Sequence, residues 1–150
     1  MSSPPNNSEF ADLLAVGRFV WLFHELPAHA ARASHWDLML ETPDSLRTWA
    51  FSCDLPNEAT GDASIVGAAV ALPNHRTAYL VYEGPVSGDR GTVRRLDAGE
   101  YTARRITPGN TWCIELNGER LRGRLAIDDP DSTNECRWQW SPRLSRDSNE

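Results

Sequence analysis

The chain has 150 residues and a formal net charge of −6, and 40% of its residues are hydrophobic and 24% charged. This length predicts one domain with a single sizeable core, and the composition is that of a globular protein. No apolar run approaches the roughly 18 residues of a membrane span. The first residues lack the basic and apolar regions of a secretory signal. We therefore expect a cytoplasmic protein that does not bind membranes.

Cysteine usage and charge narrow the function classes. Cys53, Cys113 and Cys136 are widely spaced, which argues against a disulfide framework and against a zinc site of paired cysteines. All 15 basic residues are arginine, whose planar fork suits phosphate, although a GC-rich genome produces the same bias. A net charge of −6 does not suit a protein that grips DNA mainly by releasing counter-ions. Nine of the arginines lie in residues 76–124, so a local basic face is the expectation.

The two ends of the chain and two further segments are not predicted to form strands. Residues 1–8 and 143–150 are polar and turn-rich, which predicts frayed tails around one domain of residues 9–142. Residues 9–16 are compatible with one or two helical turns. Residues 26–34 are compatible with a loop or a short helix.

Strand signals fill the rest of the chain. Apolar alternation and turn residues predict short strands at residues 19–23, 35–41, 46–51, 65–72, 76–83, 92–96, 100–106, 112–116, 120–127 and 136–140. Loops or turns separate them, including residues 54–64, 84–91 and 97–99, and Asn117-Gly118 is the strongest hairpin signal. This pattern predicts an all-β, mostly antiparallel protein. We expect a small closed or nearly closed β-barrel with one or two short flanking helices.

Three of the four histidines fall within twelve residues, at His24, His29 and His35. In the strand of residues 35–41, side chains alternate between two faces, so His35 and Asp37 share one face. An imidazole and a carboxylate at i and i+2 can share a divalent cation. Either His24, at the end of the preceding strand, or His29, in the connecting loop, supplies a third ligand on this hypothesis. A surface ion pair is the alternative interpretation.

The alternation in residues 35–41 also predicts which side chains are buried. Trp36, Leu38 and Leu40 are expected to pack in an apolar layer, while the opposite face, including Met39, borders a cavity. His75 opens another predicted strand, and Tyr79 lies four residues on, so the two share a face. The alternative interpretation is structural: His75 is a turn residue that caps a backbone carbonyl, and Tyr79 is an aromatic residue of the barrel.

Eight segments resemble, in the same order, the motifs of the 3′-phosphoesterase module of bacterial DNA ligase D. They are residues 18–20, 29–41, 46–50, 75–79, 82–84, 91–93, 97–101 and 116–123. The family pattern has a histidine, five residues, and then His-aromatic-Asp-Leu-Arg-Leu-Glu. A hairpin strand containing tryptophan follows, and later come His…Tyr…Phe-Glu-Gly, Gly-Thr-Val and a Leu-x-Gly-x-(Lys/Arg)-Leu-x-Gly hairpin. The resemblance extends over about residues 18–140.

The resemblance implies a fold, a reaction and partners. Members of this family form a small β-barrel that removes a 3′-terminal nucleoside and then the 3′-phosphate from DNA or from RNA-containing primer strands. The family uses a divalent metal, Mn²⁺ in particular, with Zn²⁺ or Co²⁺ as alternatives. The implied partners are nucleic-acid 3′ ends and a DNA ligase or other end-joining proteins. We expect this chain to be a monomer.

By position, the resemblance assigns roles to individual residues. His35 and Asp37 match metal ligands, His75 matches a histidine at the scissile phosphate, and Tyr79 matches a tyrosine of that pocket. Spacing to His35 favours His29 as the first metal histidine. The position in the strand after Phe19 favours His24, and a strand end holds a ligand more rigidly than a loop.

One position departs from the family pattern. The arginine two residues after the aspartate is Met39 here, and a thioether cannot hold a phosphate. Arg32, Arg47 or Arg76 can replace it as a substrate-binding cation, and Arg76 adjoins the catalytic candidate His75. The leading hypothesis is a metal-dependent phosphoesterase weakened by this change. The alternatives are a binding module without turnover, for nucleic-acid ends or a ligase partner, and a phosphoesterase with a different substrate.

Overall fold

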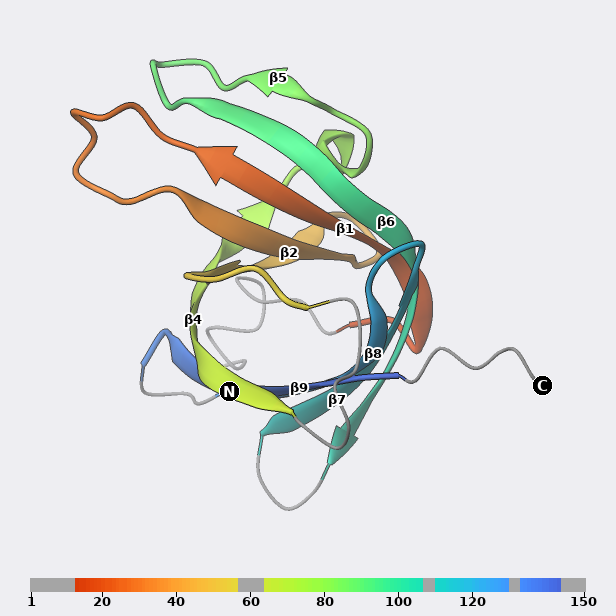
Figure 1. Cartoon of the computed structure of the whole chain (residues 1–150). Helices are drawn as coiled ribbons and strands as arrows, with labels where there is room; N and C mark the ends of the chain where they lie inside the picture. The colour runs from red at the N-terminus through yellow and green to blue at the C-terminus, as the bar shows by residue number, and fades with distance from the viewer. Residues whose placement is uncertain (1–12, 57–63, 107–109, 130–132, 144–150) are drawn as a thin grey trace, which may run out of the picture.

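The computed structural model describes residues 13–56, 64–106, 110–129 and 133–143 of the chain. These residues form one antiparallel sheet that curls into a barrel (Figure 1). Its strands are β1 (Val16–Glu25), β2 (His35–Glu41), β3 (Leu46–Phe51), β4 (Ile65–His75), β5 (Gly84–Pro85), β6 (Thr92–Ile106), β7 (Thr111–Gly118), β8 (Arg122–Asp128) and β9 (Glu135–Pro142).

Closure of the barrel depends on strand β1, which pairs with β2 on one side and with β6 on the other. The strand order is β1-β2-β3-β4-β9-β8-β7-β6, and the two-residue strand β5 adds to β6 outside this ring. All pairings are antiparallel. The predicted all-β antiparallel barrel is therefore confirmed, and closure removes the unpaired edges that an open sheet would expose.

Strand alternation divides the apolar residues between two cores. Phe19 and Trp21 of β1 point into the barrel, where they pack with Leu38 and Leu40 of β2 in the large interior core. A smaller second core lies outside the barrel wall and contains Val20, Leu22, Met39, Leu46, Leu80 and Val93. It is covered by the 3₁₀ helix η1 (Thr77–Leu80) and the segment around β5. The predicted burial is confirmed for Leu38 and Leu40, whereas Trp36 is only half-buried at the margin of the core.

Two predicted elements are wrong, and each has a physical reason. The strand predicted at residues 76–83 is replaced by η1, because this segment crosses over the second core, where Leu80 is buried. The turn predicted at residues 97–99 lies inside the continuous strand β6. Gly99 packs directly on the neighbouring strand there, since a Cβ at this position would lie 2.2 Å from the carbonyl oxygen of Asn117.

Asp97 is buried because it holds the turn between β7 and β8. Its carboxylate accepts hydrogen bonds from the backbone N–H groups of Glu119, Arg120 and Leu121, at 3.0, 2.9 and 2.6 Å. The pairing of β1 with β6 shifts register at Trp21, which accommodates one extra β6 residue beside Asp97. Asp97, predicted from the sequence to lie in a turn, thus stabilises a different turn, 22 to 24 residues further along the chain.

Other sequence expectations are settled only in part. η1 is the only helix among the described residues, so residues 26–34 form a loop. Most of the helix predicted at residues 9–16 lies outside the described residues, as do the tail of residues 1–8 and nearly all of residues 143–150. The three cysteines are unpaired, as the spacing predicted. Within the described ranges, no helix is long and apolar enough to cross a membrane.

The burial of Asp97 leads to a stability prediction. Asp97→Ala leaves three turn N–H groups without their acceptor, and each buried donor without an acceptor costs about 1–3 kcal/mol. Some of this loss is recovered by water, so we expect the free energy of unfolding in urea to fall by roughly 2–4 kcal/mol. Asp44→Ala is the matched control, because Asp44 is exposed and carries the same charge. Equal stability losses in the two variants would contradict this role.

Candidate functional site

The outer face of β1 and β2 brings two histidines and an aspartate together. His24 is the direct cross-strand partner of His35, and Leu22 pairs with Asp37. Nε2 of His35 lies 3.2 Å from Oδ1 of Asp37, and Nδ1 of His24 lies 3.8 Å from Oδ2 of Asp37. The centroids of the two imidazole rings are 4.9 Å apart and the ring planes are inclined at 62°. The antiparallel register thus places both rings against one carboxylate.

Backbone carbonyls determine which nitrogen of each ring faces Asp37. Nε2 of His24 lies 2.7 Å from the carbonyl oxygen of Arg90, and Nδ1 of His35 lies 3.1 Å from that of Ala33. Carbonyl and carboxylate oxygens both only accept hydrogen bonds, so each ring lies between two acceptors and a protonated ring can donate to both. If a cation binds beside Asp37, Nδ1 of His24 and Nε2 of His35 are the nitrogens that would face it, and the opposite nitrogens can then donate to the two carbonyls. Carbonyl anchors of this kind orient histidine ligands in metal sites.

Burial and charge act in opposite directions on this cluster. The Asp37 side chain is 2% exposed, and burial opposes its ionisation, but His24 and His35 outweigh that effect and lower its pKa. The adjacent Asp37 carboxylate raises the pKa of His24, against burial and the charge of Arg32. Asp37 is therefore an ionised carboxylate in a nearly dry position, stabilised by its two neighbours.

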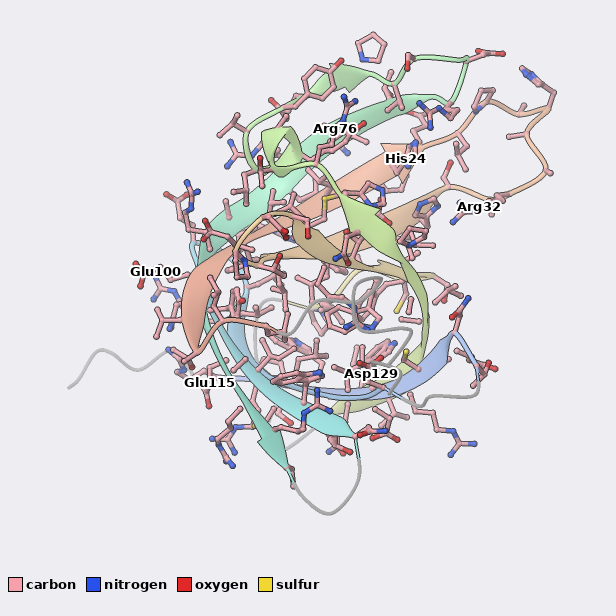
Figure 2. The ribbon with its side chains drawn as sticks, turned by 180° about the vertical axis from the view of Figure 1, so that it is seen from behind. His24, Arg32, Arg76, Glu100, Glu115 and Asp129 are labelled. Atoms are coloured by element: carbon pink, nitrogen blue, oxygen red, sulfur yellow. The ribbon has the colours of Figure 1, made fainter. Side chains whose placement is uncertain are left out.

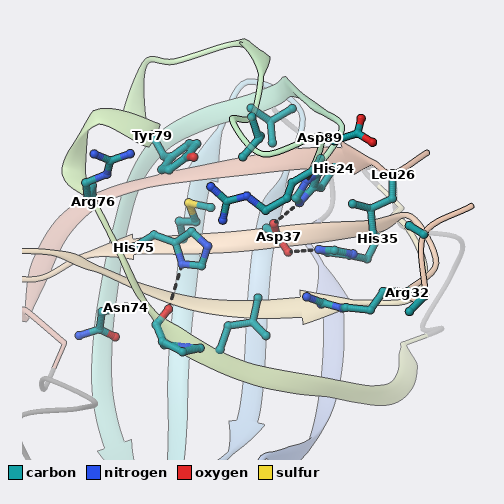
Figure 3. Close-up of a pocket in the computed structure, with 18 residues that line it drawn as sticks. His24, Leu26, Arg32, His35, Asp37, Asn74, His75, Arg76, Tyr79 and Asp89 are labelled. Atoms are coloured by element: carbon teal, nitrogen blue, oxygen red, sulfur yellow. Dashed lines mark hydrogen bonds and ion pairs between the residues drawn. The ribbon is translucent and has the colours of Figure 1, made fainter.

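The cluster lies in a pocket of about 550 Å³ (Figure 3). The residues predicted as site residues that line it are His24, Arg32, His35, Asp37, Met39, His75, Arg76 and Tyr79. They come from β1, β2, the end of β4, η1 and the loop of residues 26–34. Segments far apart in the sequence therefore meet at this one pocket.

His75 and Tyr79 form the wall opposite the cluster. Nδ1 of His75 lies 2.9 Å from the carbonyl oxygen of Pro73, so this nitrogen carries a hydrogen and Nε2 is the nitrogen left for other contacts. The ring points into the pocket in Figure 3. Tyr79 meets His75 edge to face, with ring centroids 5.8 Å apart. Although η1 replaces the predicted strand, the two side chains still share one wall, because η1 begins two residues after His75 and turns Tyr79 back against the end of β4.

Two candidate residues lie away from this pocket. His29 is exposed and its Nε2 lies 3.2 Å from Oδ2 of Asp89, so it is not part of the cluster of His24, His35 and Asp37. Arg47 is 2% exposed and its guanidinium lies 2.7 Å from Asp129.

Alternation along β3 explains the position of Arg47, because residues 47 and 49 both point into the barrel. The Arg47 guanidinium stacks on the Trp49 ring, with its central carbon 4.6 Å from the ring centroid. Figure 2 shows Asp129 in the lower part of the molecule and Arg32, Arg76 and His24 together in the upper part. Arg47 is thus a structural residue, and the expectation that it binds substrate is not supported.

Met39 lies at the floor of the pocket and is only 1% exposed. Its side chain packs in the second core with Val20 and Leu22. The prediction that residues 35, 37 and 39 border a cavity is confirmed. An apolar side chain thus occupies a floor position beside a buried carboxylate.

Sequence reasoning missed Arg90, which lines the pocket and whose carbonyl orients His24. Its side chain is tied back to Ser87, with Nε 2.6 Å from the carbonyl oxygen. Gly88, Asp89 and Gly91 around it have φ values of 76°, 57° and 83°. Two glycines flanking an arginine, next to the Gly-Thr-Val motif, were the available signal, because glycines permit the left-handed conformations of this loop.

The cluster has the composition and geometry of a metal site. One ligand atom from each of His24, His35 and Asp37 lies within 4.8 Å of the others. Oδ1 of Asp37 is buried and makes no hydrogen bond with the described residues, although Nε2 of His35 is at ion-pair distance. Two imidazoles and one carboxylate suit Mn²⁺, Fe²⁺ or Zn²⁺. The residues present therefore fit a divalent cation.

The distances around His24 predict its tautomer. When the ring is neutral and chelator is present, we expect its hydrogen on Nε2, because the carbonyl oxygen of Arg90 lies 2.7 Å from that nitrogen, whereas Asp37 lies 3.8 Å from Nδ1. Long-range ¹H–¹⁵N NMR spectra distinguish the two tautomers. A hydrogen on Nδ1 of His24 would disprove the arrangement.

Comparison with known proteins gives an independent assignment. The family model of the DNA ligase D 3′-phosphoesterase domain matches residues 27–128. Similar proteins are the multifunctional non-homologous end joining protein LigD of Mycobacterium bovis and the multifunctional non-homologous end joining DNA repair protein LigD of two Mycobacterium tuberculosis strains, CDC 1551 and H37Rv. Each is 29% identical to this chain over 116 residues, which is 73% of the chain and 14% of the relative's length. The chain therefore belongs to the DNA ligase D 3′-phosphoesterase domain family.

Proposed function

We propose that this chain is a divalent-metal-dependent phosphoesterase that processes 3′ ends of DNA or RNA-containing strands during end joining. The observation that carries the proposal is the buried Asp37 with two histidines, each in contact with a backbone carbonyl, in a pocket that also gathers His75, Tyr79 and arginines. Family membership and the names of the mycobacterial relatives support the substrate class and an end-joining partner such as a DNA ligase.

His24, His35 and Asp37 are the proposed ligands, and Mn²⁺ is the proposed cation, with Zn²⁺ or Co²⁺ as alternatives. A bound divalent cation supplies the charge that polarises a phosphate oxygen and makes water a better nucleophile. The range matched by the family model begins at residue 27, so the choice of His24 over His29 rests on geometry.

The chain's own side chains supply the remaining chemistry. In the imidazolium form of His75, Nε2 is the nitrogen available to give a proton to the leaving oxygen, because Nδ1 is engaged with the carbonyl oxygen of Pro73. Tyr79, in edge contact with His75, orients the ester or the ring. Arg32 and Arg76 are exposed at the pocket and offer charge-assisted hydrogen bonds to phosphate oxygens.

The charge distribution supports an end-binding protein over one that tracks along a duplex. The chain carries a net charge of −6, whereas three arginines and two aspartates line the pocket. Positive charge is therefore gathered where one terminal phosphate would lie. Long-range steering along a DNA backbone needs an extended basic surface instead.

The proposal is tested with a 3′-phosphorylated oligonucleotide and Mn²⁺. We expect phosphate release that chelator abolishes, and His24→Gln should lower both activity and Mn²⁺ affinity by at least about tenfold. His29→Gln is the matched control and should behave like the unmodified protein, because His29 lies outside the cluster. Calorimetry measures Mn²⁺ binding independently of turnover. Normal Mn²⁺ binding by His24→Gln, with a loss in His29→Gln, would reverse the ligand assignment.

Met39 favours a second candidate function, an end-binding module without turnover. The family pattern has an arginine at this position, whereas Met39 is buried in the second core and offers no hydrogen-bond donor to phosphate. The pocket would then hold a strand end or recruit a ligase. Metal binding is compatible with both functions, so only turnover separates them.

Met39→Arg tests how far this position limits catalysis. A charge-assisted hydrogen bond contributes about 1.5–3 kcal/mol, so restoring it should raise kcat/KM by roughly one to two powers of ten. Met39→Leu is the control, since it conserves volume and should leave the rate unchanged. Metal binding without phosphate release in both the unmodified protein and Met39→Arg would favour the binding module. If the unmodified protein is fully active and Arg76→Ala is equally active, two ideas are refuted. The loss of the family arginine at Met39 would not limit catalysis, and Arg76 would not replace it.

A further inference from the structure

Three rings lead from the pocket onto the protein surface. His75 and Tyr79 meet edge to face with centroids 5.8 Å apart, and Tyr79 meets Tyr82 in the same way at 5.9 Å. We call these three side chains the aromatic row. His75 and Tyr79 line the pocket, whereas Tyr82 is 38% exposed outside it. The row therefore extends the pocket in one direction, away from the Asp37 cluster.

The outer ring of the row is held in place without being covered. The hydroxyl of Tyr82 donates a hydrogen bond to the carbonyl oxygen of Pro85, which fixes the ring at its distal end. Val81 beside it is 72% exposed, so no described segment packs over this part of the chain. A large apolar ring that is fixed and still solvent-accessible is ready to stack on a ligand without losing much conformational freedom.

Arg76 places a positive charge beside the row, next to His75 in the sequence. Arg76 is exposed and lines the pocket, and its guanidinium makes no hydrogen bond or ion pair with the other described residues. The neighbouring acid, Glu83, is engaged with the backbone N–H of Arg95 at 2.8 Å. Because the whole chain is acidic, attraction to a phosphate backbone adds little affinity, and a bound strand must be held mainly by stacking.

We propose that the aromatic row is a stacking platform for the unpaired bases next to the processed end, with Tyr82 as its outer contact. This inference rests on the proposed function and specifies its substrate, a single-stranded or frayed end. A base inside a duplex already stacks on its neighbours and cannot offer a face to Tyr82. Arg76 binds the phosphate that links the stacked nucleotide to the end.

The test measures binding in chelator, so that it does not depend on hydrolysis. The probe is a 5′-fluorescent single-stranded oligonucleotide with a 3′-phosphate, followed by fluorescence anisotropy. Tyr82→Ala should weaken binding about tenfold, whereas Tyr82→Phe, which keeps the ring, should bind like the unmodified protein. Val81→Ala is the control for an exposed neighbour without a ring. Circular dichroism verifies that each variant is folded.

Two further measurements separate stacking from charge. The logarithm of the affinity should fall with the logarithm of salt concentration with the shallow slope of about one or two phosphates. A blunt duplex with the same 3′-phosphate should bind at least about tenfold more weakly than the single strand. Equal binding of single strand and duplex, or equal affinity of Tyr82→Ala and the unmodified protein, would overturn the platform.

Activity measurements distinguish failure of the platform from failure of the proposed function. With Mn²⁺, Tyr82→Ala should raise KM for the oligonucleotide and leave kcat/KM for a mononucleoside 3′-phosphate unchanged. Absence of hydrolysis together with ring-dependent single-strand binding would refute the phosphoesterase and support the platform. Hydrolysis that Tyr82→Ala impairs equally on both substrates would refute the platform and leave the phosphoesterase intact.

Discussion

Strand β1 has to bury both of its faces, and the rest of the molecule follows from that requirement. It closes the barrel by pairing with β2 and β6, so its inward residues Phe19 and Trp21 complete the interior core. Its outward residues Val20 and Leu22 are equally apolar and need a second cover. η1 and the segment around β5 supply it, and the edge of that cover is the rim of the pocket. The functional site is thus located where the second core ends.

The end of β1 that contains His24 depends on the segments that pack over the outer face of this strand. A buried carboxylate is costly unless charged or hydrogen-bonded partners surround it, and Asp37 has a histidine on either side. Each histidine is in turn oriented by a carbonyl oxygen from a different loop, at Ala33 and at Arg90. The loop that contains Arg90 is shaped by glycines, and a Cβ on Gly91 would lie 1.9 Å from the carbonyl oxygen of Glu25. Close packing of that loop against β1 therefore determines the orientation of His24.

Under the proposed function, charge and shape contribute separately to binding. The net charge of −6 would keep non-specific attraction to nucleic acid low, while the arginines at the pocket concentrate positive charge at one point. The proposed stacking on the aromatic row would add contact area next to that point. Selectivity for an end would then come from the distance between the pocket and the exposed ring.

The sequence by itself determined the barrel, the two faces of residues 35–41 and the pairing of His35 with Asp37, because strand alternation is local and has a period of two. It also indicated the family through ordered motifs. It did not decide between His24 and His29, since their positions relative to Asp37 depend on the register of β1 against β2 and on the path of the loop between them. It missed Arg90 and did not show that Arg47 lies away from the pocket, because the neighbours of both residues come from distant strands and loops. Only the tertiary structure decided these points, because side chains far apart in the sequence meet only after the barrel closes and the second core forms.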